Sequence, residues 1–370
     1  MQSFKPLLPM GEKTVLEHTV ELFKQAGICD IRVVIGHRAN EIAAFANATG
    51  AQVIENPYYE SGMFSSIKAG IKNLKNTQEA FFLLPVDVPL VRCQSVLELL
   101  NTWQNSEKKI FYPTFMNRRG HPPLISTEFA QKITEYKGGT GLRSFLKQHE
   151  VYATDVPVID EHILFDIDTP DDYHKMLDMY KHYDIPTTCE CLEILTRRFA
   201  VGKGILDHCL AVAQVAGYLT QILNSSGCSI EPELVNASSL LHDMLKSEPD
   251  HAQAAARVIE KMGYPRVADI VACHMDIIVE DDVSFHAAEV VYLADKLIYE
   301  GRLVPCHDRF KYKRAEYDGD INAIKAINVR YETLIKVKKR FENQTGRSLD
   351  KVLSDMTLVL DESIVYDFSY

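Results

Sequence analysis

The sequence predicts an α/β domain followed by an all-α domain. The chain has 370 residues, which suggests two domains at roughly 100 to 200 residues each. Up to about residue 180, short β-rich runs alternate with helical patterns, and from about residue 190 onward only helical periodicities remain. Such alternation is typical of strands joined by crossover helices. We therefore expect domains at 1–182 and 196–370, joined by a linker at 183–195.

The first half is predicted to form a doubly wound, mostly parallel sheet with helices around it. Its strands are expected in four β-rich runs: IRVVIG (31–36), AQVIE (51–55), AFFLLPV (80–86) and KKIFYPTF (108–115). The run TVLEHTVELFKQAG (14–27) predicts an amphipathic helix. Near the end of this domain, Thr169, Pro170 and Asp172 have the pattern of an N-cap, a first-turn proline and a capping acid.

The second half carries apolar residues at helical spacing in five long stretches. These are ILDHCLAVAQVAGYLTQIL (205–223), LVNASSLLHDMLK (234–246), HAQAAARVIEKMG (251–263), RVADIVACHM (266–275) and HAAEVVYLADKLIYEG (286–301). Pro186 lies between the two halves and predicts an interruption of helix there.

Composition favours a cytoplasmic protein that binds small molecules. The net charge of −11 argues against a nucleic-acid partner. No run reaches the ~18 apolar residues of a membrane helix, and the start lacks a signal-peptide core. The eight cysteines are dispersed, and the only close pair, Cys189 and Cys191, has no second pair to complete a metal site. We expect reduced thiols.

Histidines and acids are predicted to face the core of the helical domain. His208 shares a helix face with Val212 and Leu219, and Asp295 shares one with Val291. Between them stands the pair His242-Asp243, in an otherwise apolar stretch. Each residue could be a satisfied core or capping residue, but buried acids need a partner. Two inward acids and two inward histidines together indicate a metal, for which zinc, iron, nickel and manganese are all suitable.

The segments LLHDMLK and YLADKL, with His208 before them, resemble the HD phosphohydrolase superfamily over roughly residues 196–310. The resemblance implies that His208, His242, Asp243 and Asp295 hold a metal that activates water against a phosphoester. It further implies a second metal, because His251 and His274 stand where two-metal members carry extra histidines. Both could instead be helix-end or surface histidines. Lys246 either contacts a phosphate or is a solvated lysine.

Two acidic segments mark the α/β domain. Asp87 follows the run AFFLLPV, at the strand edge where ligands bind in doubly wound sheets. In ILFDIDTPDDY (163–173), Asp166 and Asp168 alternate with apolar residues, so we expect both acids on one face of a strand.

These segments, with KPLLPMG, NPYYESGMFSSIKAGI, RRGHPPLI and GGTGLRSFLKQH in order, resemble the molybdenum cofactor nucleotidyltransferases, especially the cytidylyltransferase type. The resemblance runs from Lys5 to about Tyr173. It implies Mg²⁺ held by Asp87 and by Asp168, or second by Asp166, while molybdopterin attacks CTP or GTP and pyrophosphate leaves. It also implies the following contacts: Lys5 with the triphosphate; Gly62, Met63, Ser65 and Ser66 with the nucleotide; and Arg119, Gly120 and His121 with the pterin.

Alternatives remain for these segments and for the whole protein. The segment 62–66 could be a plain helix start, and the arginines 118–119 could be solvated. The family's first strand and glycine-rich phosphate loop are absent from this sequence, so we expect an N-terminally truncated domain with weak transfer. The chain could therefore be an HD phosphohydrolase whose transferase domain only senses nucleotide. It could also be a non-catalytic scaffold that delivers cofactor to an apo-molybdenum hydroxylase.

Overall fold

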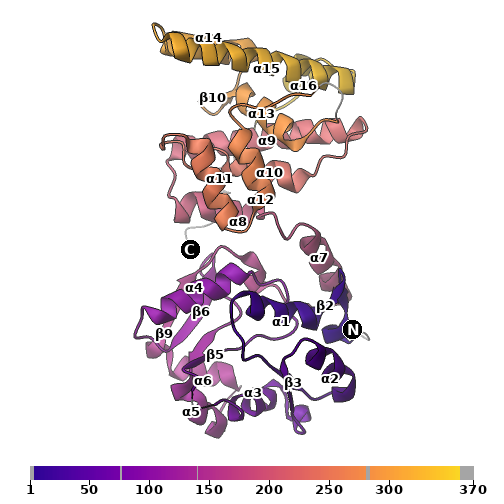
Figure 1. Ribbon diagram of the computed structural model, residues 1–370, viewed down its shortest axis with the longest axis vertical. Coiled ribbons are helices and arrows are strands. Elements are labelled where there is room, and N and C mark those ends of the chain that lie inside the picture. The colour runs from indigo at the N-terminus through magenta and orange to yellow at the C-terminus, as the bar shows by residue number, and fades with distance from the viewer. Residues whose placement is uncertain (1–3, 76, 140, 281–283, 359–370) are drawn as a thin grey trace. The chain divides into compact units, whose positions relative to one another are not determined.

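The computed structural model describes residues 4–75, 77–139, 141–280 and 284–358. It divides into two compact units, Met1–Tyr183 and Asp184–Tyr370. Figure 1 shows the first unit in indigo and magenta and the second in rose to yellow. Thr140 of the GGTGLRSFLKQH segment lies outside the described residues. The α/β class with a following helical region is confirmed.

The strands of the first unit are mostly short. They are β1 (Pro9–Met10), β2 (Lys13–Thr14), β3 (Arg32–Ile35), β4 (Gln52–Glu55), β5 (Ala80–Phe82), β6 (Ile110–Phe115), β7 (Arg118–Arg119), β8 (Leu124–Ser126) and β9 (Ala153–Pro157). β1 and β2 form a small antiparallel hairpin, and β3 pairs in parallel with β4. The larger sheet has the order β5-β8-β6-β7, with β9 parallel to β6 and the other pairings antiparallel. The sheet is therefore mixed.

Helices pack around the strands of this unit (Figure 1). They are α1 (Val15–Gln25), α2 (Ala39–Ala48), α3 (Met63–Lys72), α4 (Cys93–Gln104), α5 (Ala130–Glu135), α6 (Leu142–Gln148) and α7 (Pro170–Lys181). A capping box between Thr14 and Glu17 begins α1 as predicted, and Thr169 and Asp172 begin α7 in the same way. Residues of α3, α5 and α6 pack on β6 and β8 around Ile110.

Two strand predictions in this unit were wrong in extent. β5 ends at Phe82, so Asp87 lies in a turn some way after the strand. The segment 163–168 is not a strand: a 3₁₀ turn, Glu161–Leu164, precedes an extended stretch without ladder pairing. Period-two alternation only requires extended backbone, and here no neighbouring strand supplies the hydrogen bonds of a ladder. Asp166 and Asp168 are nevertheless both exposed, with buried Ile167 between them.

The second unit is helical. Its helices are α8 (Thr188–Glu193), α9 (Lys203–Ser225), α10 (Pro232–Leu241), α11 (His251–Lys261), α12 (Pro265–Cys273), α13 (Ala287–Leu297), α14 (Cys306–Glu316), α15 (Ile321–Thr345) and α16 (Leu349–Ser354). A two-residue hairpin, β10 (Ile298–Tyr299) and β11 (Arg302–Leu303), separates α13 from α14. Among the described residues, no helix is long and apolar enough to cross a membrane.

The core of this unit joins α9 and α13 to the C-terminal helices. Buried residues of α9 and α13 form one cluster with Phe310 of α14 and with Leu334, Val337 and Phe341 of α15. Figure 1 shows α14 and α15, in yellow, running side by side next to α13. The helices after residue 305 therefore share a core with α9 and α13, the helices that carry His208 and Asp295.

The linker predicted at 183–195 is largely helical. Thr187 and Glu190 form a capping box that begins α8, and a π-helical turn, Ile194–Arg198, follows it. Leu192 and Ile194 are buried. This stretch carries enough apolar residues to pack, so it is part of the second unit rather than an irregular connection.

Candidate functional sites

His242 and Asp243 lie at the end of α10. The sequence predicted a helix continuing through Lys246, but α10 ends at Leu241 and turns follow. The last carbonyls of a helix have no partner within the helix. His242 satisfies one of them, because its Nδ1–H donates to the carbonyl oxygen of Ser239 at 2.7 Å. The helix end therefore orients the imidazole and sets its tautomer.

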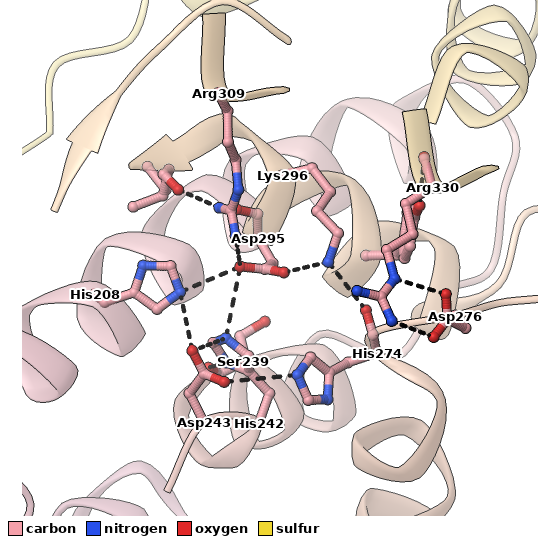
Figure 2. Close-up of polar contacts among 12 residues, drawn as sticks. His208, Ser239, His242, Asp243, His274, Asp276, Asp295, Lys296, Arg309 and Arg330 are labelled. Carbon is pink, nitrogen blue, oxygen red and sulfur yellow. Dashed lines mark hydrogen bonds and ion pairs between the residues drawn. The ribbon is translucent and has the colours of Figure 1, made fainter. Parts of the chain in front are cut away.

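The carboxylate of Asp243 lies between two pairs of histidines (Figure 2 shows three of the four). Its Oδ2 is 3.4 Å from Nε2 of both His208 and His242. Its Oδ1 is 3.4 Å from Nε2 of His251 and 3.6 Å from that of His274. The four rings stand in a row at centroid spacings of 5.3, 5.0 and 5.3 Å. Four separate helices or helix ends thus converge on one acid.

Most of these imidazoles have a nitrogen without a partner. His274 donates its Nδ1–H to the backbone carbonyl three residues earlier, at 2.7 Å, as His242 does. Among the described residues, the buried Nε2 atoms of His242, His251 and His274 make no hydrogen bond. A neutral ring protonated at Nδ1 directs a lone pair from Nε2 at the carboxylate. Two acceptors facing each other are unfavourable unless a cation lies between them, so these residues fit a metal.

The donor atoms outline two cation positions that share Asp243. Ligand atoms of His208, His242 and Asp295 lie within 4.8 Å of one another, as do those of His242, Asp243 and His274. Oδ1 of Asp295 is 3.2 Å from His208 and 3.8 Å from His242. Position A is bounded by His208, His242, Asp295 and Oδ2 of Asp243, and position B by His251, His274 and Oδ1 of Asp243.

Asp295 already has cationic partners, contrary to the expectation that only a metal would compensate it. Lys296 Nζ lies 2.6 Å from Oδ2, and Arg309 Nη2 lies 3.1 Å from Oδ1. Burial alone would raise the pKa of Asp295, but Arg309 and Lys296 hold it well below its usual range. The case for a metal therefore rests on the unpartnered imidazole nitrogens, not on Asp295.

Protons compete with a metal for this centre. Burial disfavours a charged His242, but Asp243 outweighs burial and raises the pKa of His242 well above its usual value. Burial would raise the pKa of Asp243, but His242, together with His251 and His274, holds it well below its usual range. The Nε2 atom that would carry this proton is the one that faces position A.

Lys246 contacts the Asp243 carboxylate with its ammonium group, rather than extending freely toward a ligand. Its side chain is 46% exposed and that of His251 is 21% exposed, more than any other side chain of the centre. The exposed side of the centre is therefore the side of Lys246 and His251.

In the α/β unit, the structure brings together Lys5, Asp87 and Asp168. Lys5 Nζ is 2.8 Å from Oδ1 of Asp168 and 3.7 Å from Oδ2 of Asp87. The two acid-bearing segments are held together because the N–H of Ile167 donates to the carbonyl of Asp87 at 2.9 Å. Burial opposes a charged Lys5, but the hydrogen bond to Asp168 and the charge of Asp87 outweigh it and raise its pKa.

His121 lies beside this cluster. Its backbone N–H donates to the carbonyl of Ile163 at 2.9 Å. Burial lowers the pKa of its imidazole, although Asp87 and Asp166 oppose that shift. Its buried Nδ1 makes no hydrogen bond among the described residues. The preceding Gly120 approaches Ile163 so closely that a Cβ there would lie 2.4 Å from the carbonyl oxygen. The segment 120–121 therefore places an imidazole next to the acids.

The segment 62–66 begins α3. Gly62 has φ of 91°, a conformation that favours glycine, and it precedes the helix. Sequence reasoning missed Asn56, a buried residue just after β4 whose side-chain amide donates to Ser65 at 2.8 Å and to Ser66 at 3.0 Å. The side chain of Met63 is exposed. Asn56 thus fixes both hydroxyls that the family resemblance assigned to nucleotide contact.

Arg119 lies in a cluster of surface charges. Its guanidinium donates to Glu150 and Asp155 and lies 4.2 Å from the centroid of the Tyr112 ring. The sequence resemblance placed it on the pterin side. Two nearby carboxylates and an aromatic face instead hold it in a surface ion-pair cluster.

Both units of the chain are similar to known proteins. Residues 1–154 match the family of MobA-like NTP transferase domains, and residues 205–300 match HD domains. Molybdenum cofactor cytidylyltransferase of Escherichia coli is 27% identical over 182 residues, covering 49% of this chain and 90% of its own. Nicotine blue oxidoreductase of Paenarthrobacter nicotinovorans is 27% identical over 180 residues, covering 47% and 87%. The solved structure of Rv0371c from Mycobacterium tuberculosis is 21% identical with a TM-score of 0.41, covering 48% and 90%.

Proposed function

We propose that this chain, which joins a MobA-like NTP transferase domain to an HD domain, combines a metal-dependent phosphohydrolase with a nucleotidyltransferase. The observation that supports the hydrolase most strongly is the position of Asp243 between two pairs of histidines. Three of those four rings direct an unpartnered buried nitrogen toward the acid.

For the hydrolase, His208, His242, Asp243 and Asp295 would hold one divalent transition metal, and Asp243, His251 and His274 a second. Such metals, when bound, acidify water and neutralise phosphoryl oxygens. The protein's own contribution is orientation: carbonyls fix the tautomers of His242 and His274. Lys246, at the exposed side, contacts a phosphoryl oxygen of the substrate in exchange for its contact with Asp243.

The hydrolase is tested by elemental analysis and phosphatase assays of the full chain. We expect about two equivalents of transition metal and chelator-sensitive hydrolysis of p-nitrophenyl phosphate or nucleoside monophosphates. Asp243→Ala should lose both metal and hydrolysis. Asp269→Asn, which changes an exposed acid of α12, is the matched control and should lose neither. A wild-type protein that binds no metal would overturn the proposal.

For the transferase, Lys5 would bind the triphosphate of CTP or GTP, and Asp87 and Asp168, with Asp166 in second place, would hold Mg²⁺. A terminal phosphate oxygen of molybdopterin attacks the α-phosphorus, the bond to the β-phosphate oxygen breaks, and pyrophosphate leaves. Support comes from the Lys5, Asp87 and Asp168 cluster and from the similarity to the cytidylyltransferase of E. coli.

Pyrophosphate release from CTP or GTP, with and without molybdopterin, tests the transferase. Release that depends on the pterin supports it. Nucleotide binding without release would favour a sensor domain. Binding of neither nucleotide would remove the proposal for this unit and leave delivery of a cofactor to an apo-molybdenum hydroxylase to be tested by pull-down.

A further inference from the structure

Two arginines outside the matched HD segment bind acids at or beside the candidate metal centre, from the C-terminal helices. Arg309 comes from α14 and Arg330 from α15, both after residue 300. Figure 2 shows Arg309 on Asp295 and Arg330 on Asp276, at separate places around the centre. Neither arginine stands in a recognisable motif.

Arg309 binds the carboxylate oxygen of Asp295 that Lys296 does not contact. Lys296 occupies Oδ2 at 2.6 Å, which leaves Oδ1 for His208 and for Nη2 of Arg309. Nη1 of the same guanidinium donates to the backbone carbonyls of Asp295 and Ile298 at the end of α13. Because the guanidinium group is planar and binds both the backbone and the carboxylate, it fixes the direction in which Oδ1 points. Arg309 therefore controls position A.

Arg330 holds the segment that follows His274. Its Nε and Nη2 donate to the two oxygens of Asp276 at 2.8 and 2.7 Å, and Asp276 lies two residues after His274. The backbone carbonyl of Arg330 also accepts from the hydroxyl of Tyr292, a fully buried residue one turn before Asp295. Arg330 thus anchors the turn that carries a ligand of position B.

We propose that Arg309 and Arg330 are positioning residues, one for each of two metal positions: Arg309 for A through Asp295, and Arg330 for B through Asp276 and His274. The C-terminal helices α14 and α15 are then part of the metal centre and not only of the hydrophobic core. This inference rests on the proposed two-metal centre. Loss of such outer-shell contacts typically lowers metal affinity about 10- to 100-fold.

The experiment titrates metal-free full chain with Mn²⁺ by calorimetry, one position at a time. His251→Gln leaves position A as the complete one, and His208→Gln leaves position B. In the His251→Gln background, Arg309→Gln should weaken Mn²⁺ binding about 10- to 100-fold, whereas Arg330→Gln should have little effect. In the His208→Gln background, Arg330→Gln should weaken Mn²⁺ binding and Arg309→Gln should have little effect. Arg309→Lys keeps the positive charge but lacks the planar guanidinium group, so it should recover only part of the Mn²⁺ affinity.

The melting temperatures of the metal-free variants distinguish an arginine that positions a metal ligand from one that only stabilises the fold. A merely structural arginine lowers the melting temperature but leaves Mn²⁺ affinity unchanged below the transition. Arg314→Gln is the control, because Arg314 also joins α14 to α15, by a hydrogen bond to Asn328, away from the acids. The inference is overturned if either arginine variant lowers Mn²⁺ affinity equally at both positions. It is also overturned if neither variant lowers Mn²⁺ affinity at all. Failure of the wild type to bind Mn²⁺ would instead refute the proposed centre itself.

Discussion

Ile167 donates its backbone N–H to the carbonyl of Asp87, at 2.9 Å. This single hydrogen bond joins two loops that lie about 80 residues apart in the sequence. Because the bond uses backbone atoms only, the carboxylates of Asp87 and Asp168 stay free to face Lys5. Side-chain substitutions at these acids can therefore change the chemistry of the cluster without separating the loops.

Asp87→Asn should abolish Mg²⁺-dependent nucleotide binding and leave the fold intact. The amide keeps the shape of the carboxylate but loses the negative charge that a hard cation requires. Calorimetry with CTP and GTP, with and without Mg²⁺, measures the effect. Asp171→Asn, at an exposed acid in the first turn of α7, is the control and should bind as wild type. Unchanged affinity in Asp87→Asn would remove Asp87 from the site.

His251→Gln should halve the metal content of the helical unit. His251 faces only Oδ1 of Asp243, on the side of position B, so position A keeps all of its donors. Plasma emission analysis of protein purified under identical conditions should give about one equivalent, against about two in the wild type. If the variant retains the full content, His251 is not a ligand. If it loses all metal, the two positions do not fill independently.

Metal affinity of the helical unit should rise with pH. Asp243 raises the pKa of His242, so at low pH a proton occupies the Nε2 atom that a metal needs. Affinity should therefore keep increasing from roughly pH 6 to roughly pH 9, beyond the ordinary imidazole value of about 6.5, because the raised pKa of His242 keeps its proton in place above that value. The increase is up to about tenfold per pH unit for each proton displaced. Affinity that stays constant over this range would contradict histidine ligation.

Asp160→Ala should destabilise the α/β unit by about 3 kcal/mol at neutral pH, as expected for a buried acid with several donors. Its carboxylate is fully buried and accepts from the N–H of Arg92 and the hydroxyl of Ser95, each at 2.8 Å, and from His162. Denaturant unfolding measures the change. The exposed surface pair of Asp178 and Lys181 offers Asp178→Ala as a control, which should leave the midpoint unchanged.

The effect of Asp160 should depend on pH in a defined direction. Burial opposes its charged form, but His162 and Arg92 outweigh burial and lower its pKa in the folded protein. The stabilisation is therefore complete above the ordinary carboxyl value of about 3.9 and is lost as pH falls through the lower folded value. The gap between wild type and Asp160→Ala should close in acid. A gap that persists there would mean that packing, not charge, accounts for it.

Local sequence patterns predicted the elements better than the contacts between them. The helices 205–223 and 251–263 have clear periodicity and appear where they were expected. The run at 163–168 was predicted as a strand because alternation indicates extended chain, but whether a neighbour pairs with it depends on the distant Asp87 loop. Lys246 was placed one helical turn from His242, and the end of α10 at Leu241 changed its surroundings.

The motif residues were easier to predict than the residues that hold them in place by hydrogen bonds. His208, Asp243 and Asp295 stand in recognisable spacings, and the structure brings them together. Arg309 gave no signal, because an arginine in a polar helix such as α14 is ordinarily solvated. Only its position against the end of α13 gives it a role. Asn56 was missed because its role depends on partners that lie nine and ten residues later, at the start of α3.

The dependence of α13 on the helices after it bears on how this protein is divided for experiments. A fragment that stops at residue 300, where the HD match ends, would separate Asp295 from Arg309 and the Tyr292 hydroxyl from its acceptor. It would also uncover the apolar surface that Phe310, Leu334 and Phe341 bury. Such a fragment should aggregate on expression. A fragment of residues 184–358 keeps these contacts and is the better choice for crystallisation.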